Sequence, residues 1–427
     1  MEQQGHKQRR SGEGRRRAGW TAADQVLSSS TNFAMTLLVA HFFSPSDFGA
    51  FTVAYTLYVI LLQLSRSLAT DPLSVRFSSV PVADWRRAVP QSTGTSLAVG
   101  LLAAPLTVCV GLLFGGSLRS ALVALGVMLP GLMLQDAWRF AFFAQGRPAR
   151  AATNDFIWAA VQFPALGWVL MSANTSLGAF VLVWGGSALV AAAAGCFQAG
   201  LLPRPFDARW WLRDHRDLAT RFAGEFLVFR SAMQLTLYVV GIVGGLAALA
   251  SIRAAQVLLG PLNVLFLGAT AFSVPEAVRM LSHSREEFQR ALQKLSVVLA
   301  TAAIVWGLVI FTLPTSVGIS LLGENWSGAH EVLIPVTITV AAAGASIGAW
   351  TGLRALAAAG ASLRARTLTA LLTLLMGTSG ALVAEARGAA IGLACASVLA
   401  TAVWWHAYAS MARSRRIASR PDLAAVE

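Results

Sequence analysis

The 427-residue sequence has little charge and almost no lysine. Charged residues make up 12% of the chain, and only Lys7 and Lys294 among 33 basic residues are lysines. Apolar residues make up 56%, and the mean hydropathy is +0.62. This composition is far from that of a soluble domain. The net charge of +13 would suggest a nucleic-acid partner in a soluble protein, but here the charges flank apolar segments, and we expect none.

The residue patterns of common catalytic and cofactor sites are also missing. The three cysteines, Cys109, Cys196 and Cys395, are far apart and lie in apolar segments, so neither a disulfide framework nor a Cys-type metal site is predicted. No Walker-type phosphate-binding loop occurs, and the six histidines share no metal-ligand spacing. The longest interior connection, residues 201–221, is too short to fold alone. We therefore expect no cofactor and no enzyme activity.

Twelve apolar segments of about 20 residues dominate what is present, each long enough to cross a hydrocarbon core of about 30 Å. They predict an all-α integral membrane protein. The predicted spans are residues 20–42, 48–69, 91–113, 120–142, 154–173, 177–199, 222–242, 251–275, 291–313, 330–353, 364–384 and 388–410.

The basic residues alternate with these spans. The tails and every second connection hold 29 of the 33 basic residues, the other connections hold only Arg119, Arg253 and Arg387, and Arg230 lies inside a span. By the positive-inside rule both termini are cytoplasmic and the number of helices is even. The first span carries Asp24 and Gln25 and is predicted to be an uncleaved helix in a multi-pass protein of the cell inner (cytoplasmic) membrane.

The connection at residues 201–221 divides the spans into two sets of six. It contains Trp210, Trp211, five arginines and three aspartates, a composition typical of an amphipathic segment on the inner leaflet. A shift of about 201 residues aligns Asp24 with Glu225, as a parallel internal repeat requires. We predict a basic tail (1–19), an N-lobe (20–200), an amphipathic linker (201–221), a C-lobe (222–410) and a second tail (411–427), with a cavity between the lobes.

The first predicted hairpin carries the most specific local motif. It runs Asp24-Gln25-Val26-Leu27-Ser28-Ser29, Leu38-Val39-Ala40 and Phe43-Ser44-Pro45-Ser46-Asp47-Phe48-Gly49-Ala50, and Gly260-Pro261-Leu262-Asn263 lies in the eighth span. These segments, with the length and the helix count, resemble the Wzx-type flippases of lipid-linked oligosaccharides. Their superfamily also holds the MATE multidrug exporters and the peptidoglycan lipid flippases. The resemblance implies an anionic lipid-linked glycan as substrate, membrane lipids and glycan assembly proteins as partners, and a monomer.

One other function loses most of its support, and two stay open. A major facilitator transporter normally carries a Gly-x-x-x-Asp-Arg-x-Gly-Arg type loop after its second helix, whereas this loop begins Asp71-Pro72-Leu73-Ser74-Val75-Arg76. A cation-coupled multidrug exporter of the same fold would have a lumen dominated by aromatic residues and one acid. A non-transporting scaffold of a glycan assembly complex would cause no substrate accumulation when deleted.

Polar side chains inside the spans are the candidate substrate contacts, because an ionisable group near the bilayer centre costs at least about 2.5 kcal/mol and usually faces a cavity or a partner. Arg230 lies about 12 Å from the inner end of its span by helical rise. It is either a cationic substrate contact or half of a structural ion pair. Helical spacing gives polar stripes in spans 2, 7 and 8, and the predicted substrate-binding residues are Arg230, Arg66, Arg253, Gln63, Gln234, Gln256 and Asn263.

Two acids are candidates for ion coupling. Asp24 and Glu225 each lie about 5 Å inside the inner boundary by helical rise, where they could exchange a proton or hold Arg230, Arg66 or Arg221. Glu225 and Arg221 could also form an ordinary helix pair. In the fourth span, the i, i+3 spacing of Asp136 and Arg139 favours a structural pair.

Several small residues and prolines predict local geometry. Pro45 should end the first helix, Ser46 and Asp47 should cap the next, and Gly49 should allow close helix approach. Pro261 should bend the eighth span. Gly344, Gly348 and Gly352 form a predicted packing seam.

Single-cysteine labelling tests the predicted topology. We expect a membrane-impermeant reagent added outside to label cysteines placed at Ser46, Ser176 and Ser327, but not at Ser11 or Ser419, because the basic residues divide 29 to 3 between the two sides. Strong outside labelling at Ser419 would contradict the even number of helices.

Overall fold

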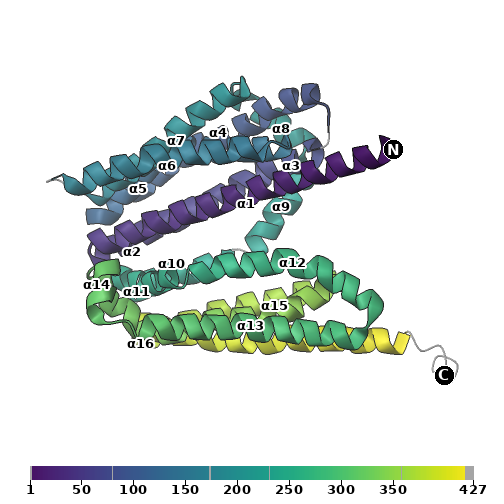
Figure 1. Ribbon diagram of the computed structural model, residues 1–427. Helices are drawn as coiled ribbons and strands as arrows, with labels where there is room; N and C mark the ends of the chain where they lie inside the picture. Colours follow the sequence, from purple (N-terminus) through teal and green to yellow (C-terminus); the bar gives the residue numbers. More distant parts are fainter. Residues whose placement is uncertain (1, 79, 173–174, 230, 357, 419–427) are drawn as a thin grey trace. The chain divides into compact units, whose positions relative to one another are not determined.

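The computed structural model describes residues 2–78, 80–172, 175–229, 231–356 and 358–418. Within these residues every regular element is a helix (Figure 1), and the predicted all-α fold class is confirmed. The chain divides into two compact units. Unit 1 comprises Met1–Thr36 and Ala50–Leu227, and unit 2 comprises Leu37–Gly49 and Val228–Glu427.

Unit 1 is built from helices of the first half of the chain. They are α1 (Glu2–Phe42, whose last residues belong to unit 2), α2 (Pro45–Ser65), the π-helix η1 (Arg66–Thr70), α3 (Asp71–Phe77), α4 (Val82–Leu112), α5 (Gly116–Ala144), α6 (Pro148–Met171), α7 (Leu177–Ala199), the 3₁₀ turn η2 (Pro205–Asp207), α8 (Ala208–Asp214) and α9 (Arg216–Phe229). Helix α5 packs against α4, α6 and α7.

Unit 2 contains the remaining helices. They are α10 (Ser231–Val243), α11 (Gly245–Leu258), α12 (Pro261–His283), α13 (Arg285–Phe311), α14 (Thr315–Leu322), α15 (Asn325–Ala355) and α16 (Ala359–Ala418). Helix α15 packs against α11, α12, α13 and α16. Two residues inside α16, Ala384 and Glu385, have non-helical backbone angles and separate two helices, at the place where the sequence predicts the last tight connection.

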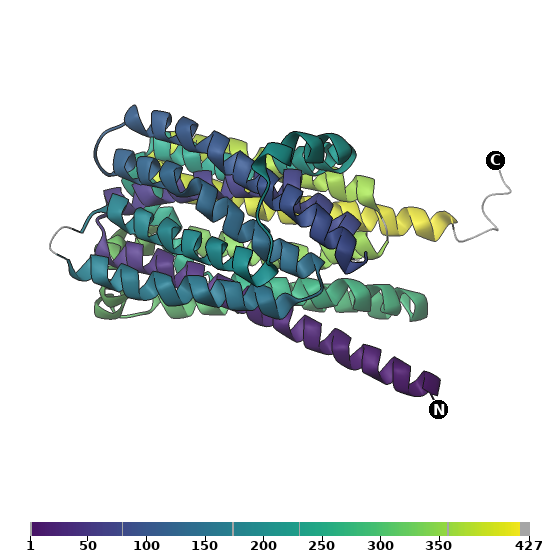
Figure 2. The same cartoon turned by 90° about the horizontal axis from the view of Figure 1, so that it is seen from above.

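The twelve predicted spans fall on helices to within two residues at their ends, leaving residues 173 and 230 aside. The exception is the span at 251–275, which is interrupted at Leu259 and Gly260. Among the described residues seven helices are long and apolar enough to cross a membrane, or eight if one bent pair forms a single span. Helix α1 differs most from expectation, since it is one helix of 41 residues that continues into the predicted tail (Figures 1 and 2).

The predicted bend at Pro261 is confirmed. Helix α11 ends at Leu258, α12 begins at Pro261, and the two axes differ by 58°. Proline lacks the N–H that would continue the helical ladder, so the break falls where the sequence places it.

In the first hairpin, the predicted helix ends are confirmed, but the predicted N-cap of the second helix is not. Helix α1 ends at Phe42 and α2 begins at Pro45. The predicted caps Ser46 and Asp47 are wrong, because the hydroxyl of Ser44 accepts the N–H of Asp47 at 3.2 Å. Proline at the first helical position moves the capping residue one place before it.

Two predicted close approaches are confirmed within unit 2. A Cβ at Gly49 would lie 2.0 Å from the carbonyl oxygen of Leu246 on α11, and a Cβ at Gly348 would lie 2.2 Å from that of Leu292 on α13. Any larger residue would push these helices apart.

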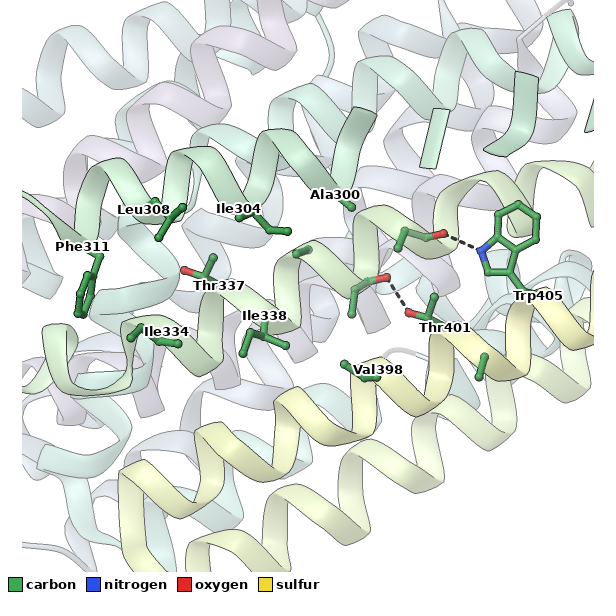
Figure 3. A pocket seen from close by; sticks show the side chains of 15 residues that line it. Ala300, Ile304, Leu308, Phe311, Ile334, Thr337, Ile338, Val398, Thr401 and Trp405 are labelled. Carbon is green, nitrogen blue, oxygen red and sulfur yellow. Dashed lines mark hydrogen bonds between the residues drawn. The ribbon is translucent and has the colours of Figure 1, made fainter. Parts of the chain in front are cut away.

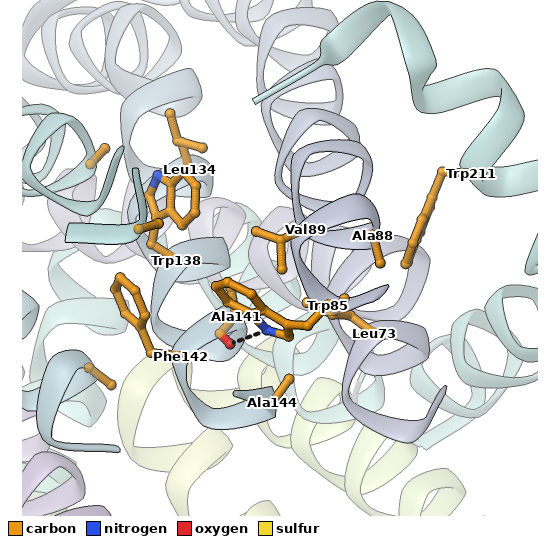
Figure 4. Close-up of a cluster of buried hydrophobic side chains, with 13 residues drawn as sticks. Leu73, Trp85, Ala88, Val89, Leu134, Trp138, Ala141, Phe142, Ala144 and Trp211 are labelled. Atoms are coloured by element: carbon orange, nitrogen blue, oxygen red, sulfur yellow. Dashed lines mark hydrogen bonds between the residues drawn. The ribbon is translucent and has the colours of Figure 1, made fainter. Parts of the chain in front are cut away.

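A cluster of large buried side chains packs the helices of unit 1 together (Figure 4). Trp85 of α4 is buried, and its indole N–H donates to the carbonyl of Ala141 on α5 at 3.1 Å. Trp138 and Phe142 of α5 stack with ring centroids 6.2 Å apart. The cluster fixes α4 and α5 next to the charged groups described below.

Candidate functional site

Buried charged side chains meet inside unit 1. Helix α1 supplies Asp24, η1 supplies Arg66, α5 supplies Asp136 and Arg139, and α6 supplies Asp155. We call these five residues the buried ion cluster. Asp24 is 0% exposed, Asp155 4%, Asp136 5% and Arg139 9%, whereas the Arg66 side chain is 20% exposed. Charges so far from water are stable only in contact with one another.

Arg139 holds together three helices. Its Nε and Nη2 atoms donate to Oδ2 of Asp24 at 2.8 and 2.6 Å, and its Nε lies 3.3 Å from Oδ2 of Asp155. One guanidinium on α5 therefore binds carboxylates on both α1 and α6. The planar donor fork of arginine suits this role, which the single ammonium of lysine would fill less well.

Arg66 makes a separate, bidentate ion pair. Its Nε lies 2.8 Å from Oδ2 of Asp136, and its Nη2 lies 2.5 Å from Oδ1. The guanidinium also lies over the ring of Phe140, 4.8 Å from its centroid. Both contacts join η1 to α5.

The π-helix sets the position of Arg66. The Asp71 N–H donates to the Arg66 carbonyl, five residues back. Because Pro72 has no N–H, the carbonyl of Leu68 lacks its ordinary helical donor, and the indole N–H of Trp211 takes that place at 3.2 Å. The hydroxyl of Ser92 donates to the next carbonyl, that of Ala69, at 3.0 Å. Side chains thus complete an irregular backbone, and π-turns of this kind are frequent at functional sites.

Two buried amides complete the cluster. Gln135 donates to Oδ1 of Asp155 at 2.8 Å, and Asn154 donates to the Ala191 carbonyl on α7 at 2.8 Å. These bonds orient Asp155 toward Arg139 and join α7 to the same network.

The charges of the cluster do not balance. With every group ionised, three carboxylates face two guanidinium groups, and the sum is −1. Within the described part of the chain, Oδ1 of Asp24 is also buried without a hydrogen-bond partner. The cluster therefore has room for one more positive charge, and a proton is the smallest.

The cluster contains two of the predicted site residues. Asp24 pairs with Arg139, which the sequence did not name as its partner, and Arg66 pairs with Asp136. The predicted pair of Asp136 with Arg139 is wrong, since each has a partner on another element. Gln63 is half-buried one turn before Arg66, and its carbonyl accepts the hydroxyl of Ser67 at 2.9 Å.

The other predicted site residues belong to unit 2 or its boundary. Arg253 and Gln256 of α11 are half-buried neighbours, with Nη1 and Oε1 3.5 Å apart. Asn263 is exposed on α12, beyond the bend. Arg230 lies outside the described residues, and so do the side chains of Glu225 and Gln234. Their roles stay predictions.

Sequence reasoning missed Asp155, Asn154 and the pairing role of Arg139. One signal was available, because Asp155 is an acid within a predicted span and one place after the start of its apolar run. Intramembrane acids are functional candidates whatever their spacing.

An apolar groove of about 670 Å³ lies on unit 2, between α13, α15 and the second part of α16 (Figure 3). Ile304, Ile334, Ile338 and Val398 line it. Thr401 donates to the Ala342 carbonyl at 2.9 Å, whereas the buried hydroxyl of Thr337 has no hydrogen-bond partner among the described residues. None of the predicted site residues whose side chains the structure describes lines it.

Removing Arg139 should destabilise unit 1. We expect Arg139→Gln to lower the free energy of unfolding by about 3–5 kcal/mol, because it leaves Asp24 and Asp155 buried without their cation. Adding Asp24→Asn should restore most of the loss. Thermal unfolding of the purified protein in detergent measures both. The control is Arg87→Gln, since the Arg87 side chain is 84% exposed and lies 3.8 Å from Asp84. An unchanged unfolding temperature for Arg139→Gln would contradict the pairing.

Comparison with known proteins identifies the fold. No protein-family model matches the chain, and no curated protein matches it. Among solved structures, an inward-facing multidrug resistance MATE family transporter of the MOP superfamily matches with a TM-score of 0.71 and 11% identity, over 91% of this chain and 96% of that one. The lipid II flippase MurJ matches with a TM-score of 0.67 and 11% identity, over 93% and 90%. A MOP superfamily transporter from Pyrococcus furiosus matches with a TM-score of 0.56 and 13% identity, over 92% and 94%. The chain therefore has the fold that these MOP superfamily transporters share.

Proposed function

We propose that the chain is a membrane transporter that moves an anionic lipid-linked oligosaccharide from the inner to the outer leaflet by alternating access, coupled to protons. The observation that carries the coupling is the buried ion cluster, in which three carboxylates share two guanidinium groups. An unpaired buried carboxylate is costly, so one of the three takes a proton in the resting protein.

The coupling step follows from the same geometry. When the proton leaves, the cluster carries a net negative charge inside unit 1, and its ion pairs must rearrange or admit water to solvate that charge. Asp24 is the group best placed to begin this change, since its Oδ1 is buried and has no hydrogen-bond partner among the described residues. Protonation of one group on α1 thus biases how α1 packs against α5 and α6.

The substrate class has separate support. Among the proteins with this fold is one named as a lipid II flippase, and the first hairpin resembles that of the oligosaccharide flippases. Basic residues inside or at the ends of spans, Arg230 and Arg253, suit a phosphate or an acidic sugar. Gln63, Gln234, Gln256 and Asn263 are the proposed contacts for sugar hydroxyls, and Glu225 is the corresponding acid of the second half.

A multidrug exporter is the second candidate, because proteins with this fold include a multidrug resistance transporter. Export of organic cations would require a cavity with exposed acids and few cations. The two candidates are separated by one reconstituted preparation, offered in turn a lipid-linked oligosaccharide and a cationic dye.

The coupling prediction concerns Asp24. In proteoliposomes, the native chain should expose a lipid-linked oligosaccharide to an outside glycosidase faster when a proton gradient is imposed. Asp24→Asn should remain folded and inserted but lose the dependence on the gradient, because an amide carries no exchangeable charge. Arg87→Gln should behave as the native protein. An undiminished gradient effect in Asp24→Asn would rule out this residue as the coupling group.

The substrate prediction concerns Arg230. If it contacts the substrate, Arg230→Ala should insert normally but abolish transport, and Arg230→Lys should retain part of it, since an ammonium keeps the charge without the bidentate fork. If it is structural, Arg230→Ala should instead reduce expression, and neutralising its acidic partner should restore it. Normal transport by a well-expressed Arg230→Ala variant would refute the substrate role.

A further inference from the structure

The linker between the two halves exposes large apolar side chains. Leu202 is 74% exposed, Phe206 95% and Trp210 58%. Single exposed apolar residues are common, but three within nine residues, two of them aromatic, form a patch that is usually covered by another molecule.

Arginines alternate with these apolar residues. Arg204, Arg209 and Arg213 are exposed, and within the described part of the chain no acidic side chain pairs with Arg209 or Arg213. Two of the three acids of the linker have arginine partners, since Asp207 lies 4.0 Å from Arg204 and Asp217 accepts two hydrogen bonds from Arg76. The third acid, Asp214, is exposed, so the three exposed arginines outnumber the acids beside them. The exposed side of α8 is therefore cationic as well as apolar.

The opposite side of α8 is fixed to unit 1. Trp211 is 1% exposed and lies against the cluster of Figure 4. Its ring stacks on His215 with centroids 3.9 Å apart, and burial lowers the pKa of His215, which favours the neutral imidazole. Arg76 donates to the carbonyl of Asp214 at 3.0 Å. These contacts leave the side of α8 that carries Arg209, Trp210 and Arg213 exposed.

We propose that this outer face binds anionic phospholipids of the inner leaflet. Phe206 and Trp210 enter the boundary between headgroups and acyl chains, and Arg209 and Arg213 contact the lipid phosphates. Aromatic rings and arginines on one side of an interfacial helix have this effect in general, and each basic residue near an anionic surface adds attraction. The charge of the face selects a lipid over a basic or neutral protein partner.

The lipid contact would also affect the buried ion cluster, through Trp211. Trp211 donates to the carbonyl of Leu68 in η1, two residues after Arg66, whose guanidinium binds Asp136. A lipid that holds α8 in place thereby stabilises the π-helix that positions Arg66. Trp211 is a positioning residue in this scheme, because it acts through the Leu68 backbone.

A nitroxide label at Phe206→Cys tests the lipid contact, in the full chain with Cys109, Cys196 and Cys395 replaced by alanine. In vesicles of phosphatidylglycerol and phosphatidylethanolamine, the label should be more accessible to oxygen than to a water-soluble nickel complex. In phosphatidylcholine vesicles this preference should fall. Arg209→Gln with Arg213→Gln should lower the equilibrium constant for insertion of the label by about fivefold per arginine.

The matched control is Arg285→Gln with Arg290→Gln, which removes two exposed arginines on another predicted cytoplasmic connection and should leave the label unchanged. A label that is equally accessible to the nickel complex in both kinds of vesicle would overturn the proposal. So would protection of the label that appears only when a second protein is added.

Hydrogen exchange tests the link to the cluster. In the native chain, anionic lipid should slow amide exchange in residues 66–77 and leave residues 177–199 unchanged. Trp211→Phe, which keeps an aromatic ring but removes the N–H donor, should abolish the lipid effect on 66–77 while the label at Phe206→Cys still enters the membrane. If the lipid effect on residues 66–77 survives in Trp211→Phe, or is absent from the native chain, lipid binding at α8 does not stabilise η1 through Trp211.

Discussion

The guanidinium of Arg139 is the interaction on which the buried part of unit 1 depends. It lies on α5 and binds a carboxylate of α1 and another of α6. In a lipid environment helices gain little from apolar contact with one another, so polar contacts carry much of their specificity. Without Arg139, two buried acids would face each other across α1 and α6. Even with Arg139 present, the cluster has one more carboxylate than it has guanidinium groups. The same residues that join the helices are therefore a candidate site for a proton.

Pro72 has effects well beyond its own turn. It removes the donor that the carbonyl of Leu68 would have in a regular helix, and the backbone before it forms the π-helix η1. The π-helix positions Arg66 next to Asp136. The indole N–H of Trp211, from the linker, donates to the Leu68 carbonyl in place of the missing N–H. Because Pro72 lacks an N–H, the linker, which is predicted to lie at the membrane surface, is hydrogen-bonded to the helix that carries the Arg66–Asp136 pair. Irregular backbone inside a membrane protein is tolerated only where side chains complete it.

The sequence predicted the elements better than the contacts. Apolar length and the positions of basic residues are local properties, and they placed twelve spans that fall on helices. Pro261 and Gly49 act on their own backbone, so the bend and the close approach were also predictable. The partner of Arg139 was not, because Asp24 is 115 positions away and periodicity gives only the face of a helix, never the neighbour it meets. Arg66 shows the same limit: helical spacing predicted it as a substrate contact, yet spacing could not reveal that Asp136 pairs with it.

The central claim is that the buried ion cluster holds one proton in the resting protein. Infrared difference spectroscopy of the purified chain measures this directly, because a protonated carboxyl group has a C=O stretch that ionised carboxylates lack. We predict such a band at neutral pH for the native protein, insensitive to Arg87→Gln, and its loss or shift in Asp24→Asn or Asp155→Asn. A native protein without any buried protonated carboxyl, or a band that neither aspartate variant alters, would contradict the account.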